Sequence, residues 1–177
     1  MEAQEKALVL GHLNSSREQL LNLVDGLTEK QWQFQPGEGR WSINQCLEHV
    51  VRVENRVLGN MQKKVSEGAD ELDKARVDDA LLVHAVQDRS TSRQAPEVAR
   101  PTGQWPNSEE LLVEFAGTRQ RTLDFAASAP DNLRNRFLPH AAFGELDCCQ
   151  WLLMLGLHGK RHAKQIEEIK ASPGFPA

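Results

Sequence analysis

Apolar residues recur at intervals of three and four along four long stretches of this chain. In the first stretch they stand at Leu10, Leu13, Leu20, Leu21, Val24 and Leu27. An α-helix has about 3.6 residues per turn, so this spacing is typical of a helix with one buried face. The same pattern predicts helices over 3–25, about 42–66, 108–129 and 147–170.

Polar residues mark where two of these helices begin. Ser42 with Gln45, and Asp147 with Gln150, have the spacing of a capping box, in which two side chains satisfy free backbone N–H groups at a helix start. Ser108 is a further candidate cap. Pro130 ends the helix that Ser108 begins, because proline cannot continue a helix.

The connections between these helices are polar and rich in proline and glycine. Thr28–Pro36 reads as a turn, and 130–146 as a loop. Within 70–89 a short apolar run predicts one shorter helix, whereas 90–107 contains three prolines and has no periodicity. No segment shows the alternation of a strand, so we predict a single all-α domain over 1–177, a four-helix bundle with one extra short helix in the long crossover.

Composition narrows the possible partners. Of 177 residues 40% are hydrophobic, and the net charge of −4 gives no basic surface for nucleic acid. No run of 18 apolar residues predicts a membrane span, and the acidic N-terminus is unlike a signal peptide. Three cysteines, two of them adjacent, argue against a disulfide framework and favour the cytoplasm.

The last helix carries the clearest chemical signal. His158 and His162 are four residues apart, so their side chains lie on one helical face, which is also the apolar face of Met154 and Ile166. Two buried imidazoles need partners, since an unpaired buried polar group costs about 1–3 kcal/mol. One metal ion would satisfy both; hydrogen bonds to other side chains are the alternative.

The second helix offers further candidates. His49 lies on the flank of the apolar stripe, so its phase leaves open whether it points inward or to solvent. We expect Glu48 to be solvated. Glu54 falls near the centre of the stripe. Three roles are open for it: pairing with a buried cation, accepting a hydrogen bond from a histidine N–H, or lying as a carboxylate at the boundary of a helix end. Cys46, one turn before His49, is a possible neighbour of the same cavity.

The remaining candidates are weaker. His140 precedes Gly144 on a loop and can border a cleft, whereas His12 and His84 are expected at the surface. Cys148 and Cys149 start a helix, a position that favours a thiolate, although a core or surface role is the default. The four tryptophans, Trp32, Trp41, Trp105 and Trp151, are expected to be core or cleft walls.

Two blocks of the sequence resemble the DinB-like (YfiT-like) proteins. Trp41-Ser42 through Leu47-Glu-His49 is similar to that family's W-S-x-x-x-x-L-x-H segment. Phe143-Gly-Glu-Leu, Trp151-Leu and His158-Gly-Lys-Arg-His162-Ala-Lys-Gln-Ile are similar to its last helix. The resemblance extends from the first helix to Lys170.

The resemblance implies a bundle of up-down-down-up order, with a long crossover between the second and third long helices. It also implies a metal triad of His49, His158 and His162, nickel or zinc as the ion, and a homodimer. Three protein ligands leave positions open for water or substrate, as in catalytic zinc sites.

The resemblance implies no single activity: some relatives transfer a low-molecular-weight thiol such as bacillithiol or mycothiol, others are labelled metal-dependent hydrolases, and many have no assigned activity. The first hypothesis is therefore a metal-dependent thiol transferase with a small-molecule substrate. A metal-dependent hydrolase and a non-catalytic metal- or ligand-binding module are the alternatives. In the first, Arg161 contacts a substrate carboxylate or a partner residue, and Gln165 supports a ligand imidazole.

Overall fold

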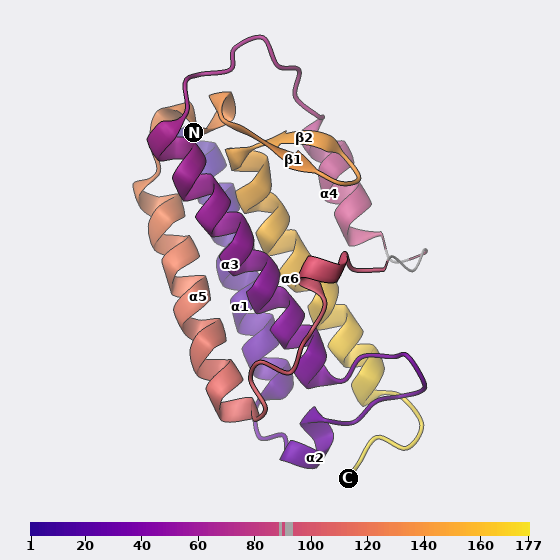
Figure 1. The fold of residues 1–177 in the computed structure, drawn as a ribbon. Helices are drawn as coiled ribbons and strands as arrows, with labels where there is room; N and C mark the ends of the chain where they lie inside the picture. Colours follow the sequence, from indigo (N-terminus) through magenta and orange to yellow (C-terminus); the bar gives the residue numbers. More distant parts are fainter. Residues whose placement is uncertain (89, 91–93) are drawn as a thin grey trace.

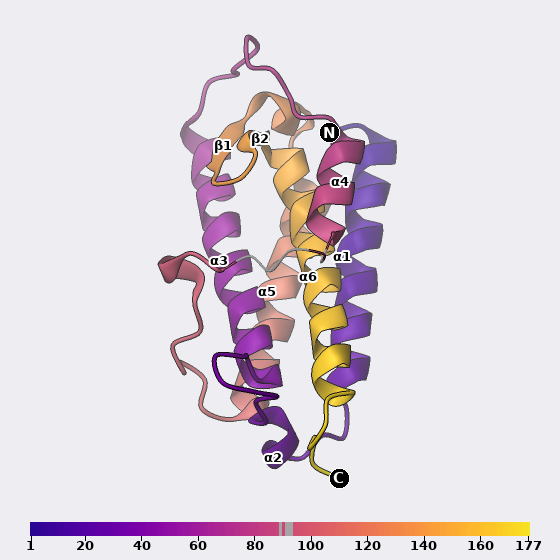
Figure 2. The same ribbon diagram turned by 90° about the vertical axis from the view of Figure 1, so that its right-hand side faces the viewer.

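The computed structural model describes residues 1–88, 90 and 94–177, and four long helices dominate it. They are α1 (Ala3–Val24), α3 (Ile43–Glu67), α5 (Ser108–Ser128) and α6 (Cys148–Lys170). Figures 1 and 2 show them side by side along one axis, with the N-terminus at one end of the bundle and the C-terminus at the other. The fold is therefore the predicted four-helix bundle.

The order of the helices is up-down-down-up. Helices α1 and α6 run one way, while α3 and α5 both run the other way (Figure 1). Two parallel neighbours need a long return, and this crossover contains α4 (Asp79–Gln87) and the 3-10 helix η1 (Glu97–Ala99). Residues 91–93 of the connection predicted over 90–107 lie outside the described residues, as does residue 89 at the end of the segment 70–89, within which one shorter helix was predicted.

Side-chain caps explain where the helices begin. Both predicted capping boxes are present: Ser42 accepts from the Gln45 N–H, and Asp147 accepts from the Gln150 N–H. At α5 the prediction was off by one residue, because Asn107 rather than Ser108 accepts the hydrogen bond from the Glu110 N–H.

The loops hold structure that the periodicity did not predict. Thr28–Pro36 contains the short helix α2 (Glu29–Trp32), and 130–146 contains the 3-10 helix η2 (Asp131–Asn135). Strands β1 (Phe137–His140) and β2 (Gly144–Asp147) pair antiparallel, with Phe137 opposite Asp147. The prediction of no strand was wrong, since four-residue strands are too short for a clear alternation of two.

Two glycines let α6 approach α1 closely. A side chain at Gly156 would come within 2.8 Å of the His12 Cβ, and one at Gly159 within 3.0 Å of Ser16. Helix backbones that approach this closely are fixed in register, which sets the height of His158 in the bundle. None of the described helices is both long and apolar enough to cross a membrane.

The buried hydrophobic side chains form two clusters, one toward each end of the bundle. Each long helix passes from one cluster to the other through polar residues at mid-height. We call these the polar layer: Ser16 of α1, Glu54 of α3, Arg119 of α5 and His158 of α6. The interior of the bundle is thus polar where the histidines enter it.

Candidate metal centre

Three imidazole rings from two helices meet at one point. The Nε2 atom of His158 lies 3.1 Å from the Nε2 of His49 and 3.1 Å from the Nε2 of His162. One ligand atom from each ring lies within 4.8 Å of the others, and among the described residues only these three form such a group. The structure therefore brings together the three histidines singled out from the sequence.

His49 is oriented by the crossover. Its Nδ1 lies 2.6 Å from the carbonyl oxygen of Ala99 at the end of η1. A carbonyl oxygen only accepts hydrogen bonds, so Nδ1 carries the proton and Nε2 presents its lone pair to the other rings. A backbone acceptor 50 residues away settles the direction that the helical phase of His49 left open.

Glu48 holds this part of the crossover against α3. The carboxylate is buried, and it accepts hydrogen bonds from the backbone N–H groups of Thr102, Gly103 and Gln104 at 2.7, 3.0 and 3.3 Å. The positive φ of Gly103, 74°, turns these N–H groups toward one anion. The expectation that Glu48 is solvated was wrong. The crossover covers this polar face of α3, which lies outside the apolar stripe.

His162 is oriented by a contact within α6. The Nδ1 of His162 lies 3.0 Å from the Oε1 of Gln165, so this ring too presents Nε2 to the cluster. The Nε2 of His158 faces both of these lone pairs but carries at most one proton. A single cation satisfies all three nitrogens at once.

The distances fit a shared ion. Imidazole nitrogen binds zinc at about 2.0–2.1 Å, which places two such nitrogens roughly 3–3.5 Å apart. Both 3.1 Å separations lie in this range. The donor set of three neutral nitrogens suits zinc, nickel and other late divalent transition metals.

The site lies largely inside the bundle. His49 and His162 are 5% and 6% exposed, whereas His158 is only partly buried. The half-buried Trp41 covers the cluster, with its ring 5.0 Å from His49 and 6.4 Å from His162, centre to centre.

Two predicted neighbours are engaged elsewhere. Glu54 is buried and pairs with Arg119 at 2.7 and 2.8 Å, so of the alternatives left open it fulfils the pairing with a buried cation. Arg161 donates to the backbone carbonyls of Val86 and Asp88 at the end of α4. Its role in the structure is to hold α4 against α6.

The other candidates lie in the core or at the hairpin. Cys46 is buried in the hydrophobic cluster that includes Leu47. The Nδ1 of His140 accepts from two backbone N–H groups in the β1–β2 turn. Cys148 and Cys149 lie in the core, one of the two roles expected by default, and burial raises the pKa of both thiols to about 12.

Burial favours the neutral form of His49 and His158. Burial lowers the pKa of His49, and the nearby Arg52 lowers it further against the opposing effect of the Ala99 hydrogen bond. Desolvation holds the pKa of His158 well below its usual range, with His162, His49, Arg161 and Arg119 acting in the same direction. Neutral rings are the form that binds a metal.

These lowered pKa values predict that the chelator-treated protein loses stability as the pH falls from about 7 toward 5. The unfolded chain takes up protons near the ordinary histidine pKa of 6.5, whereas folded His49 and His158 do not. The slope is at most about 1.4 kcal/mol per pH unit for each ring. Urea unfolding at several pH values measures it, and an unchanged slope in His158→Ala would contradict it; His84→Ala, at an exposed position, is the control.

Comparison with known proteins agrees with this architecture. The chain is 29% identical over 164 residues to YuaE of Bacillus subtilis, an uncharacterized protein, covering 89% of this chain and 94% of YuaE. Among solved structures it resembles Bacillus subtilis YfiT, described as a probable metal-dependent hydrolase with an unusual four-helix bundle topology. The TM-score is 0.65 at 15% identity, covering 96% of this chain and 88% of YfiT.

A second solved structure, the four-helix bundle protein TT2238, matches with a TM-score of 0.60 at 21% identity, over 92% of this chain and 98% of that one. At these sequence identities, the similarity to the two structures supports the fold only. The model of the DinB superfamily matches residues 12–166, which include all three histidines. The chain belongs to the DinB superfamily.

Proposed function

We propose that this protein is a metal-dependent enzyme that transfers a low-molecular-weight thiol to an electrophilic small molecule. The convergence of three imidazole Nε2 atoms, two of them with their Nδ1 atoms held by acceptors, carries the proposal. His49, His158 and His162 would hold the ion. Zinc and nickel are the ions we expect, since both accept three nitrogen ligands and keep positions open.

A divalent ion on three neutral imidazoles supplies Lewis acidity, which lowers the pKa of a thiol or water bound to it. The chain's own residues prepare the site for this. Ala99 and Gln165 fix the ring orientations of His49 and His162, and Trp41 shields one side from water.

The surroundings favour thiol transfer over hydrolysis. Activation of water gains from a carboxylate base, but the buried carboxylates of α3 are engaged: Glu48 with backbone N–H groups and Glu54 with Arg119. Among the described residues no carboxylate joins the histidine group. A thiol needs no such base, because the ion itself favours its deprotonated form.

Hydrolysis is the second candidate, and the description of YfiT favours it. The same three histidines would then serve to activate water. A module that binds a metal without turnover is the third reading, because fold and ligand set alone do not determine a reaction.

One assay separates the three. Zinc- or nickel-loaded protein is mixed with bacillithiol, mycothiol or cysteine and chlorodinitrobenzene, and thiol consumption is followed. We expect consumption above the uncatalysed rate, lost in His158→Ala and retained in His84→Ala. Equal rates for wild type and His158→Ala would reject thiol transfer. Cleavage of 4-nitrophenyl acetate without thiol consumption would favour the hydrolase, and metal binding with neither activity the binding module.

A further inference from the structure

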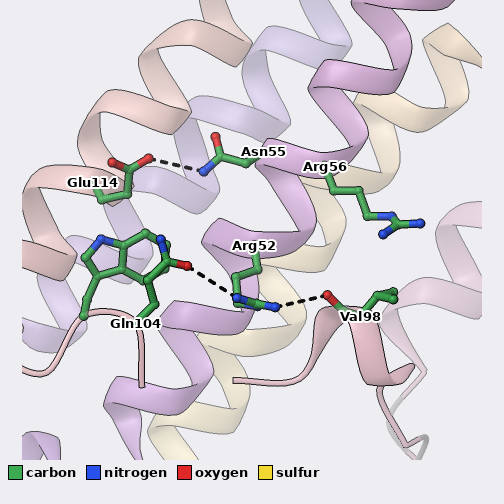
Figure 3. A pocket seen from close by; sticks show the side chains of 7 residues that line it. Arg52, Asn55, Arg56, Val98, Gln104 and Glu114 are labelled. Atoms are coloured by element: carbon green, nitrogen blue, oxygen red, sulfur yellow. Dashed lines mark hydrogen bonds between the residues drawn. The ribbon is translucent and has the colours of Figure 1, made fainter. Parts of the chain in front are cut away.

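A cavity that is separate from the histidine cluster also lies along α3. It has a volume of about 390 Å³ and is bounded by α3, α5 and the segment 98–105, as Figure 3 shows. We call it the α3–α5 pocket. None of the three histidines lines it, although Arg52 on its wall follows His49 by one helical turn. This volume falls within the range of small-molecule sites.

Arg52 stands at the centre of this pocket with an incompletely satisfied guanidinium group. Its N–H groups donate to neutral oxygens only: the Thr102 hydroxyl at 3.2 Å, the Gln104 side chain at 3.4 Å and the Val98 carbonyl at 3.4 Å. The Nε atom is buried and has no hydrogen-bond partner. In the part of the chain that the structure describes, no carboxylate lies within 4 Å of Arg52. A buried donor without a partner is costly, so the group is poised for an acceptor.

Arg56 adds a second positive charge one turn further along α3. Its side chain is exposed, and no described carboxylate lies within 4 Å of it either. Figure 3 shows Arg56 and Val98 on one side of Arg52, and Glu114 on the other side. The positive charge is therefore concentrated at the end of the pocket away from its carboxylate.

Glu114 does not cancel this charge locally. It pairs with Arg121 at 3.0 Å and accepts from the Asn55 side chain at 3.2 Å. These contacts and the Thr118 hydroxyl outweigh partial burial and lower the pKa of Glu114, so it stays ionised. Because Arg121 neutralises Glu114, Arg52 and Arg56 are the charges of the lining that remain available to an anion.

We propose that the α3–α5 pocket binds a small molecule that carries one carboxylate next to an apolar group, with the carboxylate between Arg52 and Arg56. Arginine binds carboxylates through two parallel N–H groups, and neither of these guanidinium groups has a carboxylate partner among the described residues. Trp105 and Val98 give the pocket apolar surface for the rest of the ligand. The site does not depend on a metal at the histidines or on the proposed thiol transfer.

Fluorine NMR with 4-fluorophenylacetate tests this site on the full-length protein, with EDTA present so that no metal binds the carboxylate. We expect line broadening that fits a dissociation constant below about 1 mM. Arg56→Gln weakens binding about tenfold, the loss of one charge-assisted hydrogen bond. This variant removes an exposed side chain and leaves the Arg52 contacts in place. Lys63→Gln removes the same charge from an exposed position of α3 outside the pocket and leaves binding unchanged.

Two matched probes separate the alternatives. The neutral amide 4-fluorophenylacetamide is expected to bind at least about tenfold more weakly than the carboxylate. Absence of broadening, equal binding of the amide, or equal binding by Arg56→Gln and wild type would overturn the proposal. Tighter binding of 4-fluorobenzylphosphonate than of the carboxylate would replace the proposed ligand class with a phosphate-like dianion.

Discussion

His158→Ala is expected to weaken zinc or nickel binding by at least about a hundredfold, the upper end of what removing even a supporting contact of a metal ligand costs. Its Nε2 lies 3.1 Å from the Nε2 atoms of both other histidines. Its removal therefore leaves two of the three nitrogens that would bind the ion. Calorimetric titration measures the affinity. Nickel quenching of tryptophan fluorescence gives a second readout, because Trp41 lies 5.0 Å from the His49 ring.

His140→Ala is the matched control for this variant. It removes an imidazole that lies in the hairpin turn and contacts Phe143 and Trp151 rather than the cluster. It should bind metal as the wild type does, and helical circular dichroism should be unchanged in both variants. Wild-type affinity in His158→Ala would show that the three rings do not act as one site.

Local signals in the sequence were enough to predict where α3 and α6 begin and that α6 presents two histidines on one face. The capping boxes at Ser42 and Asp147 depend on residues three positions apart, and both form. The spacing of His158 and His162 likewise determines that they share a face. Such features depend on residues within about one helical turn, so the packing of the rest of the chain is not needed to predict them.

The direction of His49 was beyond local reasoning. Its ring is aimed by the Ala99 carbonyl, and the segment that follows Ala99 is held by Glu48. Both contacts span about 50 residues and involve backbone groups, which leave no mark on hydrophobic periodicity. The family resemblance pointed to His49, but only the crossover explains how the ring reaches its place.

Arg119 is the residue that sequence reasoning missed most completely. Arginine is rarely fully buried unless paired, so a position next to Thr118 on α5 reads as a polar flank. The structure buries it fully against Glu54, whose central place on α3 was the available signal. A carboxylate at the centre of an apolar stripe should prompt a search for its cation on the helices around it.

Loss of the Arg119–Glu54 ion pair should lower the stability of the fold more than the other substitutions considered. Arg119 donates to Glu54 at 2.7 and 2.8 Å, and also to the Leu13 carbonyl and the Ser16 hydroxyl at 2.7 and 2.6 Å. It thus ties α1, α3 and α5 together within the polar layer. Arg119→Met leaves the carboxylate buried without a partner, and we expect a loss of about 3–5 kcal/mol in the free energy of unfolding.

Urea unfolding distinguishes the cost of a buried, unpaired carboxylate from the ordinary loss of a contact. The double variant Glu54→Leu/Arg119→Met removes both charges, and we expect it to recover most of the stability, since an apolar pair of similar volume often replaces a buried ion pair without cost. Arg121→Met, which breaks the more exposed pair with Glu114, should cost less than about 1 kcal/mol. A double variant no more stable than Arg119→Met would mean that the polar layer depends on the Leu13 and Ser16 contacts of Arg119 rather than on charge pairing.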